Sequence, residues 1–183
     1  MLARAFSQDP FLDALLPADR RQQRLQQTFR SDLVLVTAVP HAIDLAVDEG
    51  GAVLGAAIWA LPGSTAGSAL AAVRALPSAL RAGGRSIRRL AAAGEAVART
   101  RPTQPHWYLA TLAVDPEVSG GGIGSSLLRH RLAQIDAERS PVYLEASIPT
   151  VVGYYERFGF RRLGEVTAPG APPMTRMWRE PVL

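Results

Sequence analysis

Apolar residues follow two different repeating patterns in the first third of the chain. Residues 2–16 and 18–36 carry apolar side chains at a helical spacing, with polar positions between them. Residues 43–47 and 53–61 are instead short, nearly continuous apolar runs, which predict strands. The tetrapeptide Asp48-Glu49-Gly50-Gly51 separates these runs and predicts a hairpin turn. Within the first segment, Asp9 before Pro10 can cap a new helical turn. We therefore expect two helical segments followed by an antiparallel pair of strands.

A strand, a helix and a second strand follow one another in the centre of the chain. Trp107–Val114 and Val142–Ala146 are apolar runs of strand length, and residues 125–139 between them have a helical spacing. Strands joined by a helical crossover within one sheet run parallel. We therefore expect these two strands to be parallel neighbours.

The C-terminal part predicts a short helix and two more strands. The helix covers residues 150–158 and is ended by Gly159, and the strands cover residues 161–166 and 175–179 around a proline-rich turn. Neither a linker nor an internal repeat interrupts this mixture of helices and strands. The pattern favours a single α/β domain with a mixed sheet, spanning residues 1–183.

A segment rich in Ala, Gly and Arg covers residues 64–101, and we expect it to be a helical insertion or a lid. Residues 85–99 have the spacing of an amphipathic helix. Pro77 and Gly83-Gly84 are expected to break the part before this helix into short pieces. The arginines of the segment do not predict nucleic-acid binding, because no aromatic residues lie among them.

The composition narrows the possible functions. With 48% apolar and 20% charged residues the chain is globular, and no apolar run is long enough to span a membrane. Cysteine is absent, which excludes disulfides, thiolate metal ligands and a cysteine nucleophile. The histidines, His41, His106 and His130, lack the spacing of metal ligands, so no metal is expected. A cytoplasmic location without membrane or nucleic-acid partners is the default expectation.

A glycine-rich turn lies between the strand Trp107–Val114 and the following helix. Gly120, Gly121, Gly122 and Gly124 allow backbone N–H groups to turn toward an anion at the helix N-terminus. The spacing does not fit the dinucleotide fingerprint G-x-G-x-x-G. A Walker A loop requires lysine, which the chain lacks. The remaining interpretation is the pyrophosphate turn of an acyl-CoA-dependent acyltransferase.

Three ordered segments resemble the GNAT superfamily of N-acetyltransferases. They read VDPEVSGGGIGSSLL, YLEAS and YYERFGF in chain order. The superfamily signature is Gln/Arg-x-x-Gly-x-Gly/Ala after a strand, with a later Tyr-Glu-Lys/Arg-x-Gly-Phe. Residues 119–124 match both glycines of the first block, and residues 155–160 match the second block throughout. More narrowly, the chain resembles the puromycin N-acetyltransferase branch of the superfamily.

The resemblance implies a GNAT-like fold, in which helices flank a mixed sheet and the parallel central strands splay apart. Relatives begin with a strand before the first helix, whereas this sequence starts within that helix. We therefore expect the first edge strand to be missing and the sheet edge there to be exposed. A homodimer, in which a second copy covers this edge, is an open alternative.

The resemblance also implies acetyl-CoA as cosubstrate, lying along the strand and the glycine turn. The pantetheine arm would run beside Leu112, Ala113 and Val114, and the Val114 N–H would hold the thioester oxygen. Backbone amides of the turn would bind the pyrophosphate. These turn residues are Ser119, Gly120, Gly121, Gly122, Ile123, Gly124 and Ser125. Because Ser119 replaces the larger family residue, we expect the turn to bind through its backbone alone.

Tyr155 and Glu145 are the candidate catalytic residues. The resemblance makes Tyr155 the general acid that protonates the departing thiolate, and a phenol with a pKa of about 10 is protonated at neutral pH. Glu145 interrupts an apolar strand, where a carboxylate is costly unless paired or functional. We interpret it as the general base, directly or through water, or as the anchor of a cationic amine. The alternatives are a carboxylate paired with an arginine of a covering helix, and His106 as the base.

Together these assignments predict transfer of an acetyl group from acetyl-CoA to the primary amine of a small molecule. Without cysteine, direct attack in a ternary complex is expected instead of an acyl-enzyme. The acceptor would sit near Phe6, Phe11, Trp59 and residues 64–101, although the pattern favours these aromatics as core residues. The alternative function is a non-catalytic acyl-CoA-binding or regulatory protein.

Overall fold

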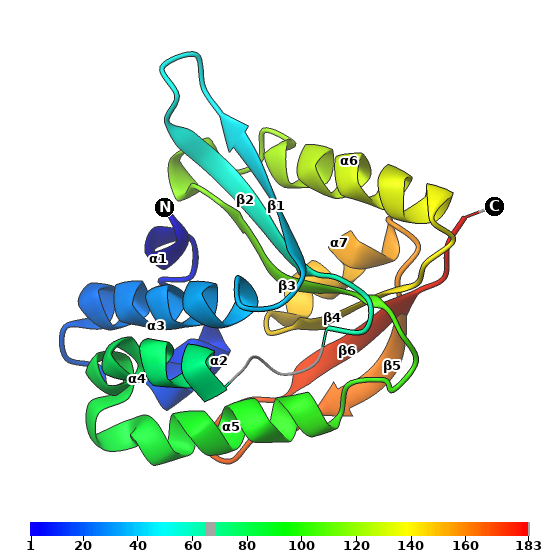
Figure 1. Ribbon diagram of the computed structural model, residues 1–183. Helices are drawn as coiled ribbons and strands as arrows, with labels where there is room; N and C mark the ends of the chain where they lie inside the picture. The colour runs from blue at the N-terminus through cyan, green and yellow to red at the C-terminus, as the bar shows by residue number, and fades with distance from the viewer. Residues whose placement is uncertain (65–68, 183) are drawn as a thin grey trace.

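The computed structural model describes residues 1–64 and 69–182, and within them the strands form one six-stranded sheet (Figure 1). The strands are β1 His41–Val47, β2 Val53–Ala60, β3 Trp107–Val114, β4 Val142–Ala146, β5 Arg161–Val166 and β6 Met174–Arg179. Their order in the sheet is β1-β2-β3-β4-β6-β5. The neighbours β3 and β4 are parallel, and the other neighbouring pairs are antiparallel. The predicted mixed sheet and its parallel central pair are confirmed.

Helices cover both faces of this sheet (Figure 1). On one face lie α6 (Ile123–Ala137) and α7 (Val152–Glu156). The helices of the other face all precede β3 in the chain. They are α1 Leu2–Ala5, α2 Pro10–Leu15, α3 Arg21–Val36, α4 Ala69–Gly83 and α5 Ile87–Arg99. Short 3-10 turns occupy Gly84–Ser86, Pro116–Val118 and Pro149–Val151.

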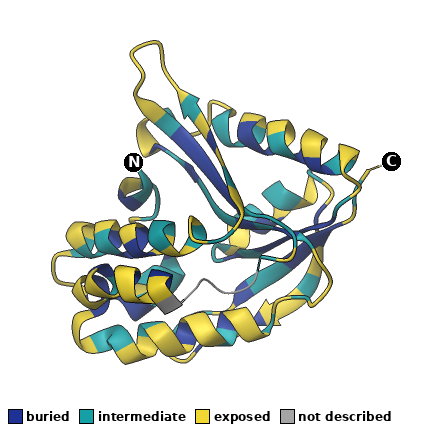
Figure 2. Ribbon diagram, in the orientation of Figure 1, coloured by how far each residue is buried: buried dark blue, intermediate teal, exposed yellow. Residues whose placement is uncertain are grey.

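The main core lies between α6 and the central strands, and Figure 2 shows the buried side of α6 turned toward the sheet. Leu128 and Ile135 of α6 are fully buried there, and burying a side chain of this kind contributes about 1.5–3 kcal/mol. Trp59 of β2 is also fully buried. Its indole N–H donates to Asp44 at 3.1 Å, and Arg131 of α6 donates to the same carboxylate at 2.9 Å. Trp59 is therefore a core residue and not an acceptor contact.

The predicted N-terminal helix at residues 2–16 divides into α1 and α2. Asp9 precedes α2, and its Oδ1 accepts the Leu12 N–H at 2.8 Å. Pro10 occupies the first helical position, where its missing N–H costs nothing. The new helical turn that Asp9 and Pro10 predict is therefore present as α2.

The prediction that Pro77 breaks residues 64–84 into short pieces is wrong. Residues 69–83 form one helix with Pro77 inside it, while residues 65–68 lie outside the described part of the chain. A proline within a helix removes one backbone hydrogen bond. The buried small residues Ala71, Ala75 and Ala82 offset this loss, because they allow α4 to pack closely against α3.

Arg24 of α3 completes the end of α4. Its guanidinium donates to the carbonyl oxygen of Ala82 at 2.9 Å and to that of Arg81 at 3.2 Å. The last carbonyls of a helix have no partner within the helix, so a donor from a neighbouring element stabilises this end. The helix then ends at Gly83, as the glycine pair predicted.

β1 forms one edge of the sheet, and no strand lies beyond it in residues 1–64 or 69–182. The first residues, Leu2–Ala5, are helical instead of extended. Side chains of β1 on the face away from α6 are apolar and exposed: Ile43 is 39% exposed, Leu45 54% and Val47 55%. The expected exposed edge is present, and its cover by a second copy of the chain stays a prediction.

Candidate active site

The two parallel strands at the centre of the sheet separate after a short contact. β3 and β4 pair only at Trp107↔Val142 and Tyr108↔Tyr143. Beyond these pairs β3 continues beside β2, and β4 continues beside β6. Ala110 of β3 has no register partner on β2 and forms a bulge just past the last parallel pair. A bulge bends its strand, so it helps β3 to leave β4. The predicted splay is confirmed, whereas the bulge was not predicted.

Backbone amides of β3 point into the opening between β3 and β4. The Asp115 N–H donates to the Leu54 carbonyl oxygen beside β2 at 2.8 Å. Successive residues of a strand turn their N–H groups to opposite sides. The N–H groups of Leu112 and Val114 therefore point away from β2, toward the unpaired side, and that of Ala113 points toward β2. Two of the three residues predicted to lie beside the pantetheine arm thus offer donors to the opening.

The glycine turn joins the end of β3 to α6 and presents free amides. Gly120 and Gly122 have φ of +88° and +81°, a left-handed conformation that favours glycine. In the described part of the chain, no acceptor is bonded to the amides of the helix start. These residues are Gly122, Ile123, Gly124 and Ser125. Unpaired amides at the start of a 15-residue helix form a site for an anion.

Two predicted turn residues use their amides within the turn itself. The Ser119 N–H donates to the Pro116 carbonyl oxygen at 3.3 Å, and the Gly121 N–H donates to that of Val118 at 3.4 Å. They shape the turn instead of offering donors to a ligand. The Ser119 side chain is exposed and makes no hydrogen bond among the described residues. The amides that stay available to an anion are therefore those of Gly120 and residues 122–125, and binding of a ligand through them stays a prediction.

Gly124 fits closely between β3 and α7. A Cβ built on Gly124 would lie 3.2 Å from the Tyr154 hydroxyl oxygen and 3.4 Å from Cγ2 of Val114. The same Tyr154 hydroxyl accepts a hydrogen bond from the Ser125 hydroxyl at 3.4 Å. The sequence predicted only packing for Tyr154. The structure adds a hydroxyl that borders the anion site, which no sequence pattern signalled.

Tyr155 lies on α7, on the α6 side of the sheet. Its ring is 5.8 Å from that of Phe160 and 5.3 Å from that of Tyr154, between centroids. Burial raises the pKa of Tyr155 well above its ordinary value, so the phenol keeps its proton at every physiological pH. A residue that must protonate a leaving thiolate needs this property.

Glu145 lies on the opposite face of the sheet from Tyr155. Its neighbours Leu144 and Ala146 belong to the α6 core, and side chains of a strand alternate between faces. The Glu145 side chain is only 4% exposed, and its Oε1 lies 3.5 Å from Nε of Arg101. Arg101 follows α5, so the contact matches the alternative of an arginine partner from a covering helix. Glu145 Oε1 nevertheless makes no hydrogen bond among the described residues.

Aromatic rings line the space around Glu145. The Arg101 guanidinium lies over the Tyr108 ring, 3.9 Å from its centroid, and Tyr108 stacks on Tyr143 at 6.1 Å. Burial, followed by the charge of Glu145, raises the pKa of Tyr143 to about 12, and the same causes raise that of Tyr108. Sequence reasoning missed Arg101 and Tyr108. The two-residue period of β3 could have assigned Tyr108 to the face of Glu145.

His106, the alternative base, lies at the start of the same cluster. Its ring is 5.4 Å from that of Tyr143 and 5.5 Å from that of Trp178. Nδ1 lies 2.6 Å from the Gln104 carbonyl oxygen. Burial lowers the pKa of His106 below its ordinary value, so the ring is neutral at pH 7. His106 and Glu145 therefore share one environment, and both stay candidates.

The N-terminal helices hold the ends of both strands that border the opening. Arg4 of α1 forms an ion pair with Asp115, at the end of β3. Asp9, which caps α2 and is 2% exposed, accepts a hydrogen bond from the Ser147 hydroxyl just after β4. These two contacts fix the width of the opening on the side of Glu145. Neither was predicted, because they join residues far apart in the sequence.

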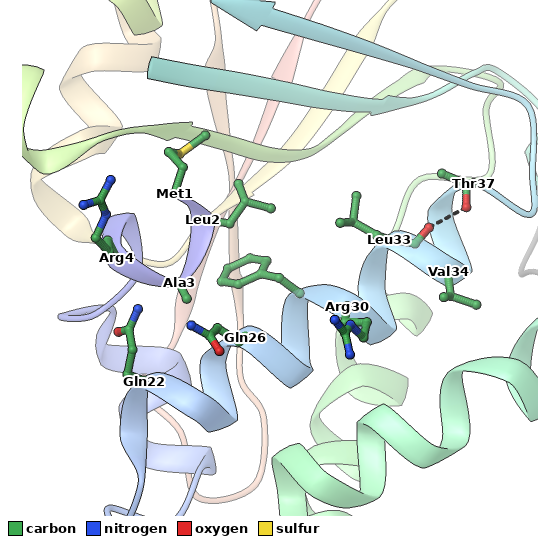
Figure 3. A pocket seen from close by; sticks show the side chains of 11 residues that line it. Met1, Leu2, Ala3, Arg4, Gln22, Gln26, Arg30, Leu33, Val34 and Thr37 are labelled. Atoms are coloured by element: carbon green, nitrogen blue, oxygen red, sulfur yellow. Dashed lines mark hydrogen bonds between the residues drawn. The ribbon is translucent and has the colours of Figure 1, made fainter. Parts of the chain in front are cut away.

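An open groove of about 620 Å³ lies between α1 and α3 (Figure 3). Leu2 and Arg4 contribute to one wall, and Gln26, Arg30 and Leu33 contribute to the other. None of the predicted catalytic or cofactor-binding residues lines it. The groove is therefore separate from the opening between β3 and β4.

The residues that the structure describes contain neither a group of metal ligands nor a membrane-spanning helix. No three His, Asp or Glu side chains within residues 1–64 and 69–182 are grouped to hold a metal ion. Within the same ranges, no helix has the length and apolar character needed to cross a membrane.

Comparisons with known proteins agree with this geometry. A family model described as "Acetyltransferase (GNAT) domain" matches residues 85–162, which include the glycine turn, Glu145 and Tyr155. A solved structure of "histone acetyltransferase HPA2 and related acetyltransferase" from Corynebacterium glutamicum ATCC 13032 is 30% identical to this chain. That match covers 100% of this chain and 88% of the other, with a TM-score of 0.74.

More distant structures share the fold. A GCN5-related N-acetyltransferase from Kribbella flavida is 17% identical over 97% of this chain and 90% of its own, with a TM-score of 0.54. The ribosomal-protein-S18-alanine N-acetyltransferase from Escherichia coli is 16% identical over 86% and 77%, with a TM-score of 0.50. Identity of 30% across the whole chain, added to the splayed strands and the glycine turn, shows the family. The chain belongs to the GNAT family of acetyltransferases.

Proposed function

We propose that this GNAT acetyltransferase transfers the acetyl group of acetyl-CoA to the primary amine of a small molecule by direct attack in a ternary complex. One observation carries the proposal: the opening between β3 and β4 has Tyr155 beside one face of the sheet and Glu145 on the other. A thioester held in the opening would be accessible to an acid from one side and to an amine and its base from the other.

Free backbone donors support the position of the donor substrate. Acetyl-CoA is the acetyl donor of GNAT acetyltransferases, and it carries a pyrophosphate and an amide-containing arm. Unpaired amides at residues 122–125 suit the pyrophosphate, and open space beside Gly120 and Gly122 leaves room for it. The unpaired edge of Leu112–Val114 suits the arm, which would pair with it as a strand does.

In this proposal, a residue of the chain assists each step of the acetyl transfer. Glu145 takes a proton from the ammonium group of the acceptor, directly or through water, and the neutral nitrogen bonds to the carbonyl carbon. The Val114 N–H donates to the oxygen on which negative charge develops. As the carbon–sulfur bond breaks, Tyr155 gives its proton to the sulfur. The attacking nitrogen still carries two protons and loses one of them to solvent as the amide forms. Tyr155 regains a proton from solvent, and Glu145 returns its proton there, so one proton is released overall.

Initial-velocity kinetics test this proposal. Thiol release is measured for the full chain with a panel of primary amines while both substrates are varied. A ternary complex gives intersecting lines in double-reciprocal plots, whereas an acetyl-enzyme would give parallel lines and contradict direct attack. Binding of acetyl-CoA without thiol release for any amine would contradict a small-molecule acceptor and favour the non-catalytic alternative. Puromycin belongs in this panel, because the relation to puromycin N-acetyltransferases stays a prediction.

A further inference from the structure

The polar cluster around Glu145 contains more positive charge than negative. Arg101 is paired with Glu145 at 3.5 Å. Arg176, on β6, forms no ion pair among the described residues, and its Nε is buried without a hydrogen-bond partner. Arg176 is half-buried, so only its Nε is cut off from water, and an anion or an acceptor at that atom would compensate the lost hydration. Asp9, the other carboxylate on this side, is bonded to Ser147 and to the Leu12 N–H, so Glu145 is the one carboxylate that faces the two guanidinium groups.

Tyr143 adds an unused donor next to this guanidinium. Its side chain is fully buried, and its hydroxyl lies near Arg176 and Glu145 without a well-formed hydrogen bond to either. The charges of both Glu145 and Arg176 act on this phenol, so the three side chains are neighbours. The half-buried Arg176 guanidinium, with its buried Nε, and the buried Tyr143 hydroxyl therefore lie together beside the carboxylate of Glu145.

The register of the sheet sets the spacing of these groups. Glu145 of β4 and Arg176 of β6 are directly opposite each other in an antiparallel pair. Side chains at such positions share a face, with Cβ atoms about 4.5–5.5 Å apart. A ligand that meets both must carry a positive and a negative group separated by only a few bonds. An α-amino acid has this arrangement, with one carbon between its ammonium and its carboxylate.

We propose that the acceptor is an α-amino acid or a close analogue, whose amine meets Glu145 and whose carboxylate binds Arg176 and Tyr143. The inference rests on the proposed function and names its substrate class. A guanidinium binds a carboxylate through two parallel hydrogen bonds, which gives both charge and orientation. Arg176 thereby acts as a specificity residue, because it orients the amine toward the opening while it holds the other end of the acceptor.

Matched pairs of substrates test the inference. Acetyl transfer to phenylalanine, leucine and tryptophan is compared with transfer to phenethylamine, isoamylamine and tryptamine, which lack only the carboxylate. The full wild-type chain should prefer the amino acid by about 10- to 100-fold in kcat/KM, the value of a charged hydrogen bond. Arg176→Gln should reduce that preference, measured as the ratio of kcat/KM within each pair, to about threefold or less. Tyr143→Phe should lower the preference by a smaller factor.

Two controls separate recognition from folding. Arg161→Gln removes a guanidinium from an exposed position of the neighbouring strand β5 and should leave the preference unchanged. Thermal unfolding of Arg176→Gln should show little loss of stability, since Arg176 forms no ion pair within 4.0 Å among the described residues, whereas a merely structural arginine would lower the midpoint. Arg176→Lys should restore part of the preference through charge alone.

The outcomes are distinct from those for the proposed function. Efficient transfer to the decarboxylated amines with no preference for the amino acids would overturn the inference and leave the proposed function intact. An equal preference in wild type and Arg176→Gln would also overturn it. Absence of transfer to either member of every pair would contradict the small-amine function and the inference together.

Discussion

The two sides of the opening between β3 and β4 present different chemical groups. On the α6 side, the candidate site consists of backbone amides, glycines and an aromatic group that includes Tyr155. On the other side it consists of charged and phenolic side chains around Glu145. The first side suits a ligand that is the same in every GNAT enzyme, because backbone donors depend little on residue type. The second side depends on side chains and can differ between relatives, so acceptor choice belongs there.

The largest expected effect tests the charged side. Glu145→Gln removes the proton acceptor while it keeps the size of the side chain, so turnover should fall by about 100-fold or more. Acetyl-CoA binding should change little, because the proposed donor site lies on β3 and the glycine turn. Steady-state kinetics and equilibrium binding of acetyl-CoA check both statements.

His106→Ala is the matched comparison for this variant. If His106 were the base, wild-type kcat/KM would fall as pH drops through the pKa of that residue, which burial places below its ordinary value. This fall at low pH, the acidic limb of the pH–rate profile, would be lost in His106→Ala and kept in Glu145→Gln. Loss of the limb in Glu145→Gln alone supports Glu145, and retention in both variants would refute both candidates.

A smaller effect is expected on the aromatic side. Tyr155→Phe removes only the hydroxyl that protonates the thiolate, so turnover should fall by about tenfold or more. The fold and the affinity for acetyl-CoA should be retained, since the ring still packs against Phe160. Tyr154→Phe is the matched control, because it removes a hydroxyl that lies at the anion site instead. Unchanged turnover in Tyr155→Phe would reject the acid role.

The smallest effect tests the backbone site alone. In Gly124→Ala the added carbon would lie 3.2 Å from the Tyr154 hydroxyl, so α7 or the turn must shift. Overpacking of about 1 kcal/mol should weaken acetyl-CoA binding by roughly fivefold. Gly121→Ala is the control, because that position has ordinary φ and a Cβ there would be 3.4 Å from one carbonyl oxygen. Equal affinities in the two variants would show that the fit of Gly124 does not matter.

The sequence predicted the elements whose signals are local. The strands β3, β4 and β5 have the predicted bounds, and the glycine turn has its predicted position. Pro77 misled the prediction, because close packing of small residues against α3 outweighed a local breaking signal. Tertiary contacts of this kind override propensity and cannot be read from a single segment.

The candidate site likewise has one part that local sequence motifs predicted and one part that depends on tertiary contacts. The glycine motif and the tyrosine motif identified the backbone side from short segments of sequence. On the charged side only Glu145 was singled out, because a carboxylate in an apolar strand is conspicuous. Arg101 and Arg176 approach it from a loop and from another strand. Their meeting depends on strand order, in which β6 lies between β4 and β5, and the sequence pattern did not specify that order.

The short contact between β3 and β4 also has a mechanical meaning. Only two residue pairs join the half-sheet β1-β2-β3 to the half-sheet β4-β6-β5, so a seam runs through the middle of the sheet. Central amides are usually the best protected against hydrogen exchange, but those of Leu112 and Val114 lie along this seam, so we expect them to exchange like edge amides. A donor that pairs with them closes the seam and adds its binding free energy to the stability of the fold. The acetyl donor is then a structural element of the enzyme as well as its reagent.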